Sequence, residues 1–554
     1  MRSRGWLWLL ACGLLALPAC STTHAPAHTA QFTVSFPAAA HEGPITGRAF
    51  VFITTKPTPE PRLQSLGYGG NHPFFAVDVS QLAPGQPAVI NAASAGAPLA
   101  SLRDLPAGDY YVQALMDVYT RFPRADGHVI WAHMDQWEGQ QFNISPDNLV
   151  STVQKVHLDP RQGFDVALST AKVLPPVSVP LDTEWVKHVK IQSPMLTKFW
   201  GHPMYLGATV LLPQGYAQHP HTDYPVVYLQ GHFSLNPPYG FTTVKHTPTT
   251  REQQRRAVDG TETGYEFYQE WSSPTFPKMI VVTFQHPTPY YDDSYAVNSA
   301  NNGPYGDAIL QELIPYVETH FRIIRKPADR MLTGGSTGGW ESLALEVQHP
   351  DVFGGTWTFF PDPLDFHHFQ SVDLYNDTNA FWAPVSTEWH KVPRYMARQP
   401  DGQPLTTYQE MSRDEAVLGS HGRSDQQLDA FFAVFGPVGP DGYPVGFWNL
   451  QTGAIDRSAV DYARDHGYDI TAYLKQNWAT VGPQLVNKIH VYVGDMDTYY
   501  LNLGVYGLQD FLKTTEHPHY EGTFEYGRPE KPHGWNGGMT HAELLRQIYA
   551  AMAH

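Results

Sequence analysis

The sequence predicts an all-β, sandwich-like domain followed by an α/β domain with a mostly parallel sheet and helices on both faces. Three observations support this prediction. β-branched and aromatic runs bounded by Gly, Pro and Asn occupy the first third of the chain with no helical pattern between them. A Pro-rich segment, KVLPPVSVPLD at 172–182, follows them. From about residue 205, buried-strand and helix patterns alternate, which is typical of a parallel sheet covered by helices.

The N-terminus has the pattern of a targeting signal. Two arginines precede the apolar stretch WLWLLACGLLALPA, which is too short to cross a bilayer as a helix. The stretch ends in LPAC at 17–20, which resembles the bacterial lipobox, a signal that is cleaved before a cysteine that becomes lipidated. An ordinary secretory signal cleaved nearby is the alternative. We expect residues 1–19 to be a signal peptide, Cys20 the lipidated residue and 20–29 a tether. The protein would then be a lipoprotein of the bacterial cell envelope, anchored in the outer membrane.

Composition narrows the possible functions. The chain has 554 residues, of which 42% are hydrophobic, enough for a large core and more than one domain. Its formal charge of -17 argues against nucleic acid as a partner, because phosphates require a basic face. Close histidine pairs lack the helical spacing with a carboxylate that metal motifs show, and no phosphate-binding or dinucleotide-binding glycine motif occurs. We therefore expect no cofactor and no metal.

The predicted sandwich-like domain spans 30–175 and a linker spans 176–185. Its strands are short runs separated by turn residues, as in immunoglobulin-like sandwiches. The clearest are AFVFITT (49–55), FFAVDVS (74–80), DYYVQALMDVYT (109–120) and VSTVQKVHL (150–158).

The α/β domain spans 186–554. Continuous apolar runs predict buried strands at 205–213, 224–231 and 279–284. The segment 305–321 has apolar residues at the helical period, although Pro315 predicts a kink or a late helix start. A long insertion at 361–480 is aromatic and polar. It is either a lid or side wall over a site, or a peripheral decoration.

A serine lies in a glycine-rich turn of this domain. Gly334-Gly335-Ser336-Thr337-Gly338 reads G-x-S-x-G between a short strand, RMLTG, and a helix that starts near Thr337. Strand, turn and helix in this order are typical of a nucleophile elbow, in which only small residues fit beside the serine. The hydroxyl then lies at a helix N-terminus, where backbone N–H groups favour negative charge. The alternative is a glycine-rich turn with a buried, inert serine.

A catalytic serine needs a base and a group that orients the base. Downstream, the strand KIHVYV is followed by Asp495 and Asp497, either of which could serve as the acid. His533 lies between the last expected strand and the last expected helix (540–552), while His541 in that helix is the weaker candidate. If neither aspartate were the acid, Asp362 and Asp365 of the insertion would be the next candidates.

The segments YPVVYLQGHF, TGGSTGGWESL, VGDMDTYYLN and KPHGW resemble the esterase D family of α/β-hydrolases, and the resemblance covers residues 195–554. It implies a serine esterase in which Ser336 is the nucleophile and His533 the base. The family's GxxD spacing, counted from Gly494, selects Asp497 as the acid. It also places an oxyanion donor after the third strand, where Gln230-Gly231-His232-Phe233 departs from the family's His-Gly pair.

We therefore expect Ser336, Asp497 and His533 to hydrolyse a carboxylic ester through an acyl-enzyme, with backbone N–H groups of Thr337 and His232 holding the oxyanion. The substrate would be a small-molecule or glycan-linked ester. Two alternatives remain at this point. The same triad could serve an acyltransferase or a peptidase, or the chain could be a non-catalytic surface-binding lipoprotein.

Overall fold

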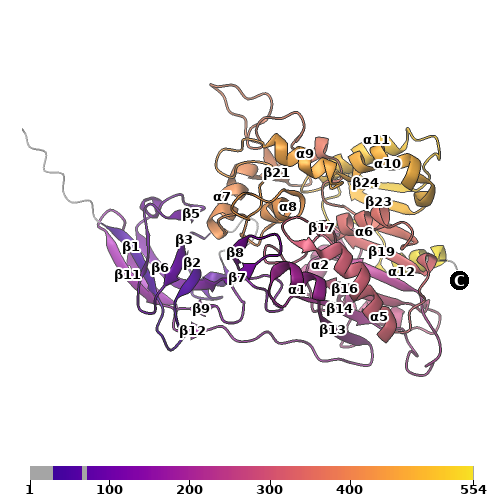
Figure 1. Cartoon of the computed structure of the whole chain (residues 1–554), viewed down its shortest axis with the longest axis horizontal. Helices are drawn as coiled ribbons and strands as arrows, with labels where there is room; N and C mark the ends of the chain where they lie inside the picture. Colours follow the sequence, from indigo (N-terminus) through magenta and orange to yellow (C-terminus); the bar gives the residue numbers. More distant parts are fainter. Residues whose placement is uncertain (1–28, 65–71, 553–554) are drawn as a thin grey trace, which may run out of the picture.

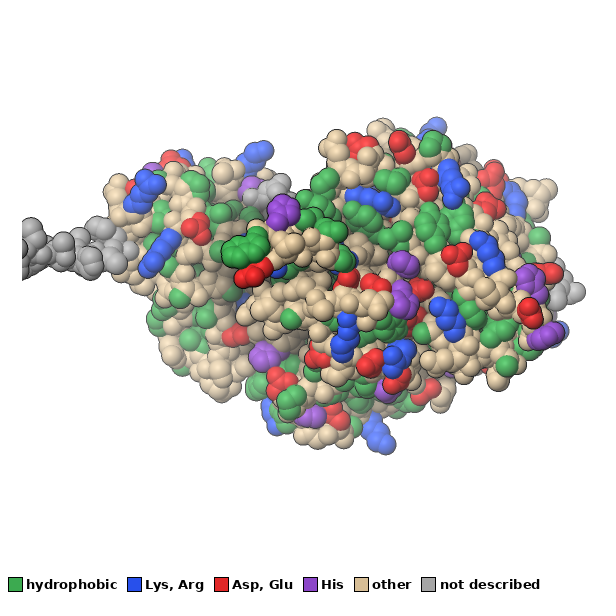
Figure 2. All heavy atoms as spheres, turned by 90° about the horizontal axis from the view of Figure 1, so that it is seen from above, with side chains coloured by type: hydrophobic (Ala, Val, Ile, Leu, Met, Phe, Trp, Pro, Cys, Tyr) green, Lys and Arg blue, Asp and Glu red, His purple; other side chains and the backbone are tan. Residues whose placement is uncertain are grey.

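The computed structural model describes residues 29–64 and 72–552. The predicted signal peptide, Cys20 and most of the tether lie outside the described residues. Within the described ranges, no helix has the length and apolar character needed to cross a membrane. On the face shown in Figure 2, acidic and basic side chains are interspersed, so the net charge of -17 is not gathered in one patch there.

The N-terminal part is a β-sandwich (Figure 1, left). A three-stranded sheet, β11-β1-β4, faces a larger sheet of order β12-β9-β6-β2-β3-β5, in which β10 also pairs with β6. Apolar side chains from both sheets, such as Phe32 and Val51, form one core. The strands are β1 (Ala30–Ser35), β2 (Ile45–Thr54), β3 (Phe74–Leu82), β4 (Ala88–Asn91), β5 (Ala95–Ala97), β6 (Gly108–Val118), β9 (Leu149–Val150), β10 (Gln154–Leu158), β11 (Phe164–Ser169) and β12 (Lys172–Val173).

The C-terminal part is built on an eight-stranded sheet of order β13-β14-β16-β15-β19-β20-β23-β24. Only the pairs β13–β14 and β14–β16 are antiparallel, and all the other pairs are parallel. The strands are β13 (Val186–Gln192), β14 (Tyr205–Leu211), β15 (Val226–Gln230), β16 (Ile280–Gln285), β19 (Arg330–Gly335), β20 (Gly355–Phe359), β23 (Ile489–Gly494) and β24 (Thr523–Gly527).

Helices cover both faces of this sheet. Alternate residues of one strand face opposite sides, so Val227 packs with α3 and α12 whereas Tyr228 packs with α1 and α5. These features confirm the predicted fold class. The helices are α1 (Pro194–Trp200), α2 (Thr250–Asp259), α3 (Gly264–Trp271), α4 (Tyr305–Ala308), α5 (Ile314–His320), α6 (Thr337–Gln348), α10 (Ile470–Leu485), α11 (Leu501–Leu512) and α12 (His541–Ala551).

The helix expected around Pro315 is interrupted. α4 continues into a π-helical segment at Ile309–Leu313, and α5 then starts with Pro315 in its first turn. A proline lacks the N–H that an α-helix interior needs, and the first turn is where that loss is tolerated. The chain is helical from Tyr305, so a late helix start is wrong, and the interruption that Pro315 predicted takes the form of the π-helical segment before it.

The insertion at 361–480 packs against both parts and lies above them in Figure 1. Val417 and Leu418 join a cluster with Phe50 and Phe52 of β2, and Arg48 donates to the carbonyl of Val417 at 3.0 and 2.8 Å. Both faces of β2 are therefore covered. The insertion contains β21 (Tyr395–Arg398), β22 (Pro404–Thr407), α7 (Tyr408–Leu418), α8 (Gln427–Phe435) and α9 (Arg457–Asp465).

A hairpin from the N-terminal part enters the core of the α/β part. β7 (Thr120–Pro123) and β8 (Val129–Ala132) pair only with each other, and Phe122 packs on Trp200 of α1 with ring centroids 5.1 Å apart. Phe122 is fully buried in the cluster that lines one face of the large sheet. The two parts thus share a core, and the predicted boundary at 176–185 stays a prediction.

We expect Phe122→Ala to lower the free energy of unfolding by about 3–5 kcal/mol, because it leaves a cavity in this shared core. Val129→Ala on the same hairpin is the control, since Val129 is 44% exposed and its truncation should cost within about 0.5 kcal/mol. Urea denaturation measures both. A loss below about 1 kcal/mol for Phe122→Ala would contradict a shared core.

Candidate active site

Ser336 lies in a strained turn between β19 and α6. Its backbone has φ 58° and ψ -124°, a combination that costs a non-glycine residue about 1–3 kcal/mol. The neighbouring glycines make the turn possible. A Cβ added to Gly334 would lie 2.2 Å from the carbonyl oxygen of Gly338, and one added to Gly338 would lie 2.2 Å from that of Gln230. The close approach of three backbone segments explains why G-x-S-x-G is needed here.

His533 and Asp497 are hydrogen-bonded. The Nδ1 of His533 lies 2.9 Å from Oδ2 of Asp497, and the Asp497 side chain is fully buried. The other oxygen of Asp497 accepts the N–H groups of Tyr499 at 2.9 Å and Leu501 at 3.3 Å. The His533 ring is 20% exposed and lies edge-on to the ring of Phe360. This bond fixes the proton on Nδ1 and leaves Nε2 free to accept a proton.

The structure separates the two candidate acids. Asp495 faces another loop, where Oδ1 accepts the N–H of Lys531 at 3.3 Å and Oδ2 lies 4.0 Å from Arg528. It makes no hydrogen bond to His533 among the described residues. The residue hydrogen-bonded to His533 is therefore Asp497, the one that the GxxD spacing indicates.

The Ser336 hydroxyl faces Asp362, one of the two reserve candidates for the acid. Oγ of Ser336 lies 3.5 Å from Oδ1 of Asp362, and within the described ranges it makes no hydrogen bond to His533. Catalytic hydrogen bonds are often long or misaligned without substrate. Asp362 follows β20 and accepts the hydroxyls of Tyr295 at 2.7 Å and Thr337 at 2.9 Å. Burial raises the pKa of Asp362 although these hydrogen bonds oppose the shift.

The two predicted oxyanion donors lie at the ends of adjacent strands. In the part of the chain that the structure describes, neither the N–H of Thr337 nor that of His232 donates to a protein acceptor. The N–H of Ser336, in contrast, donates to the carbonyl of Phe359 at 3.1 Å. Both predicted donors are thus available to a ligand.

The His232 side chain is held by two carboxylates. Its Nδ1 lies 3.1 Å from Asp292 and 3.2 Å from Asp293. Desolvation opposes protonation of the ring, but the two carboxylates outweigh it and hold the pKa of His232 well above its ordinary value. Among the described residues, these three side chains are the one group of three or more His, Cys, Asp or Glu residues whose ligand atoms all lie within 4.8 Å of one another. His232 and Asp292 are 60 residues apart, so no local sequence motif could predict this cluster.

The insertion reaches this site. Nε of Arg398 on β21 donates to the carbonyl oxygen of Asp497 at 3.1 Å, and Gln427 of α8 hydrogen-bonds Tyr295 and lies 3.5 Å from Asp362. These contacts favour a side wall of the site over a peripheral decoration. Asp365, by contrast, caps a short helical turn through the N–H of His367.

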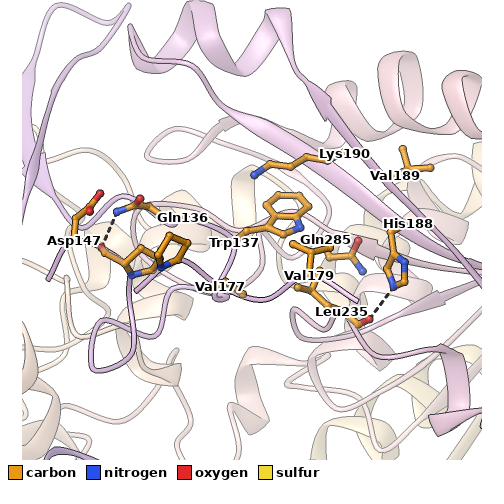
Figure 3. A pocket seen from close by; sticks show the side chains of 12 residues that line it. Gln136, Trp137, Asp147, Val177, Val179, His188, Val189, Lys190, Leu235 and Gln285 are labelled. Atoms are coloured by element: carbon orange, nitrogen blue, oxygen red, sulfur yellow. Dashed lines mark hydrogen bonds between the residues drawn. The ribbon is translucent and has the colours of Figure 1, made fainter. Parts of the chain in front are cut away.

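A cavity of about 510 Å³ is bordered by neighbours of the predicted nucleophile and base. Its lining includes Gly335, which precedes Ser336, and Gly534, which follows His533, together with Phe360 and His232. A second cavity, of about 320 Å³, lies where the linker crosses the α/β part (Figure 3). There Lys190 lies 4.1 Å from the ring centre of Trp137, and none of the predicted site residues lines it. The neighbours of the predicted nucleophile and base therefore border the first cavity and not the second.

The strand order and the elbow define the chain's C-terminal part as an α/β-hydrolase. The model of the family described as "Putative esterase" matches residues 204–430, all of which lie in the α/β part. The predicted resemblance is confirmed, and the protein is a hydrolase of the carboxylic ester class. No curated protein sequence matches the chain at a significant level.

Three solved structures illustrate what the chain is similar to. A ferulic acid esterase aligns with TM-score 0.36 and 15% identity over 66% of this chain and 98% of its own. The fluorophosphonate-binding serine hydrolase F of Staphylococcus aureus aligns with TM-score 0.32 and 14% identity over 67% and 98%. An S-formylglutathione hydrolase from Agrobacterium tumefaciens aligns with TM-score 0.32 and 12% identity over 67% and 98%. Because these scores are low, the fold assignment rests on the strand order and the activity class on the family match.

Proposed function

We propose that the protein cleaves its ester through a Ser336–His533–Asp497 triad and a covalent acyl-enzyme. The observation that supports this most is the 2.9 Å bond between His533 and buried Asp497, at the cavity that also borders the Ser336 elbow. Asp497 holds the proton of His533 on Nδ1, so Nε2 is the basic nitrogen. It also stabilises the imidazolium that forms during the reaction.

In the first half-reaction, Oγ of Ser336 attacks the ester carbonyl while Nε2 of His533 takes its proton. The N–H groups of Thr337 and His232 hold the oxyanion. The attack gives a tetrahedral intermediate. When this intermediate collapses, the bond between the carbonyl carbon and the alcohol oxygen breaks, and the alcohol leaves with the proton from His533. In the second half-reaction, water gives a proton to His533 and its oxygen attacks the acyl group. The acid is released and Ser336 regains its proton.

Pre-steady-state kinetics with p-nitrophenyl acetate test this proposal. An acyl-enzyme that hydrolyses slowly gives a burst of p-nitrophenolate equal to the enzyme concentration, followed by a slower steady phase. Ester panels of rising acyl length, with feruloyl sugars and acetylated xylan beside them, then define the substrate. Failure to hydrolyse any ester, with no burst, would contradict the proposal.

We also propose that the protein is a lipoprotein anchored to the bacterial outer membrane through Cys20. The LPAC motif at 17–20 supports this, since lipidated Cys20 would be the first residue of the mature chain. Cys20→Ala is expected to move the protein from the membrane fraction to the soluble fraction, because a fully modified lipoprotein carries several acyl chains and one alone anchors only marginally. Esterase activity per molecule should not change. Wild-type protein found in the soluble fraction would contradict the anchor.

A further inference from the structure

Two arginines from α2 line the cavity beside Ser336. Arg251 and Arg255 are one helical turn apart, so they lie on the same face of the helix, and both border the cavity. Neither guanidinium has an ion-pair partner within residues 29–64 and 72–552. The next residue, Arg256, is instead paired with Glu266. The only acid in the first turn of α2, Glu252, is used in the capping box with Thr249.

The other groups of this wall cancel the positive charge only in part. Asp259 also borders the cavity and carries one negative charge, but its Oδ1 already accepts the N–H of Thr261 at 2.8 Å and the Thr261 hydroxyl. Burial, and then the positive charge of Arg255, lower the pKa of His541 to about 3, so His541 is neutral at ordinary pH. Two guanidinium groups and one carboxylate therefore border the cavity, so these three side chains give it a net positive charge in a chain whose formal charge is -17.

The inner lining of the cavity is polar. The Gln230 side chain at the end of β15 and the Thr283 hydroxyl on β16 have no hydrogen-bond partner among the described residues, although the two residues are 3% and 8% exposed. The Tyr239 hydroxyl and Oδ1 of Asn536, from two other loops, are also buried and have no hydrogen-bond partner among the described residues. All four residues border this cavity. A buried polar group without a partner costs about 1–3 kcal/mol. An apolar ligand would keep that cost, whereas a ligand with oxygen atoms would remove it.

We propose that this cavity binds an anionic, oxygen-rich group of the substrate ester, such as a carboxylate, and that Arg251 and Arg255 determine this specificity. The inference rests on the proposed function, because it assigns a substrate class to the same site. Gly335 and Gly534 border the cavity next to Ser336 and His533, so a group bound there lies close to the scissile carbonyl. Guanidinium groups suit this role because they bind carboxylates through two parallel hydrogen bonds.

Matched neutral and anionic esters test the proposal. On the acyl side, p-nitrophenyl butyrate is compared with mono-p-nitrophenyl succinate, which has the same chain length and a terminal carboxylate. On the alcohol side, methyl 4-acetoxybenzoate is compared with 4-acetoxybenzoate. The wild-type enzyme is expected to prefer the anionic member of at least one pair by tenfold or more in kcat/KM, and 0.5 M NaCl should weaken that preference.

The double variant Arg251→Gln/Arg255→Gln is expected to lower kcat/KM for the preferred anionic ester about 10- to 100-fold, the usual effect of losing charge-assisted hydrogen bonds. Its kcat/KM for the neutral ester should stay within about twofold. Arg256→Gln is the matched control, since Arg256 lies on the same helix but pairs with Glu266. It should leave both esters unaffected.

The outcomes separate this inference from the proposed function. Hydrolysis of the neutral esters without preference for an anionic partner, or a preference that persists in the double variant, would overturn the inference and leave the esterase mechanism standing. If none of the four esters is hydrolysed, the proposed function fails and the inference fails with it.

Discussion

Ser336→Ala is expected to lower kcat for any ester substrate by about 10⁶, the scale seen when catalytic serines of serine proteases are removed. The fold should survive, because among residues 29–64 and 72–552 the Ser336 hydroxyl has one long hydrogen-bond contact, 3.5 Å to Asp362, and alanine is no larger. Steady-state hydrolysis of p-nitrophenyl butyrate and a thermal melt measure the two effects.

Ser342→Ala is the matched control on the same helix. The buried Ser342 hydroxyl donates to the carbonyl of Gly339 at 3.0 Å, so its loss should cost about 1 kcal/mol of stability and leave turnover near the wild-type value. Ester turnover by Ser336→Ala above about 1% of wild type would move the nucleophile to another residue.

Asp497→Asn is expected to lower kcat about 10⁴-fold, as the equivalent change does in the serine protease triad. Asparagine keeps the shape of the side chain, but its amide can no longer hold the proton of His533 on Nδ1 as a carboxylate does. The fully buried position of Asp497 means that no other charge replaces it. The same p-nitrophenyl ester assay at neutral pH measures the effect.

Two further variants test the other candidate acids, Asp495 and Asp362. Asp495→Asn is expected to lower kcat tenfold or less, because Asp495 contacts Lys531 and Arg528 and not His533. Asp362→Asn removes the carboxylate 3.5 Å from Ser336. A larger loss for Asp495→Asn than for Asp497→Asn would reassign the acid to Asp495. If neither change mattered and Asp362→Asn abolished turnover, the acid would come from the segment after β20.

The elbow could be predicted because it depends on local sequence, whereas the His533–Asp497 pair, 36 residues apart, was predicted from the order of the elements and the family resemblance. The glycines around Ser336 are required by backbone contacts within a single turn, and the strand and helix beside them have clear apolar patterns. The choice of Asp497 over Asp495 needed the family's GxxD spacing, since both follow the same strand. The structure adds the direction of each side chain.

The parts that could not be predicted depend on contacts between distant segments. Asp362, Arg398 and Gln427 reach the site from an insertion whose aromatic and polar sequence has no single period. The hairpin around Phe122 lies within 30–175, the range predicted as a sandwich, because an apolar pattern shows that a residue is buried and not which core buries it.

The two arginines of α2 that border the cavity, Arg251 and Arg255, could not be predicted from the sequence either. α2 is rich in charged and polar side chains, so its apolar pattern is weak, and nothing in the order of its residues shows that Arg251 and Arg255 border the cavity next to the Ser336 elbow. The residues that line this cavity come from segments far apart in the sequence, so the cavity can be recognised only in the folded structure.

The central claim is that Ser336 is the nucleophile, and covalent labelling followed by peptide mass spectrometry tests it most directly. The full-length protein is treated with a fluorophosphonate probe, digested, and the modified residue is located by fragmentation. We predict one adduct per chain, on Ser336, and no labelling of Ser336→Ala under the same conditions. An adduct on another residue, or wild-type protein that hydrolyses esters without being labelled at Ser336, would contradict the account.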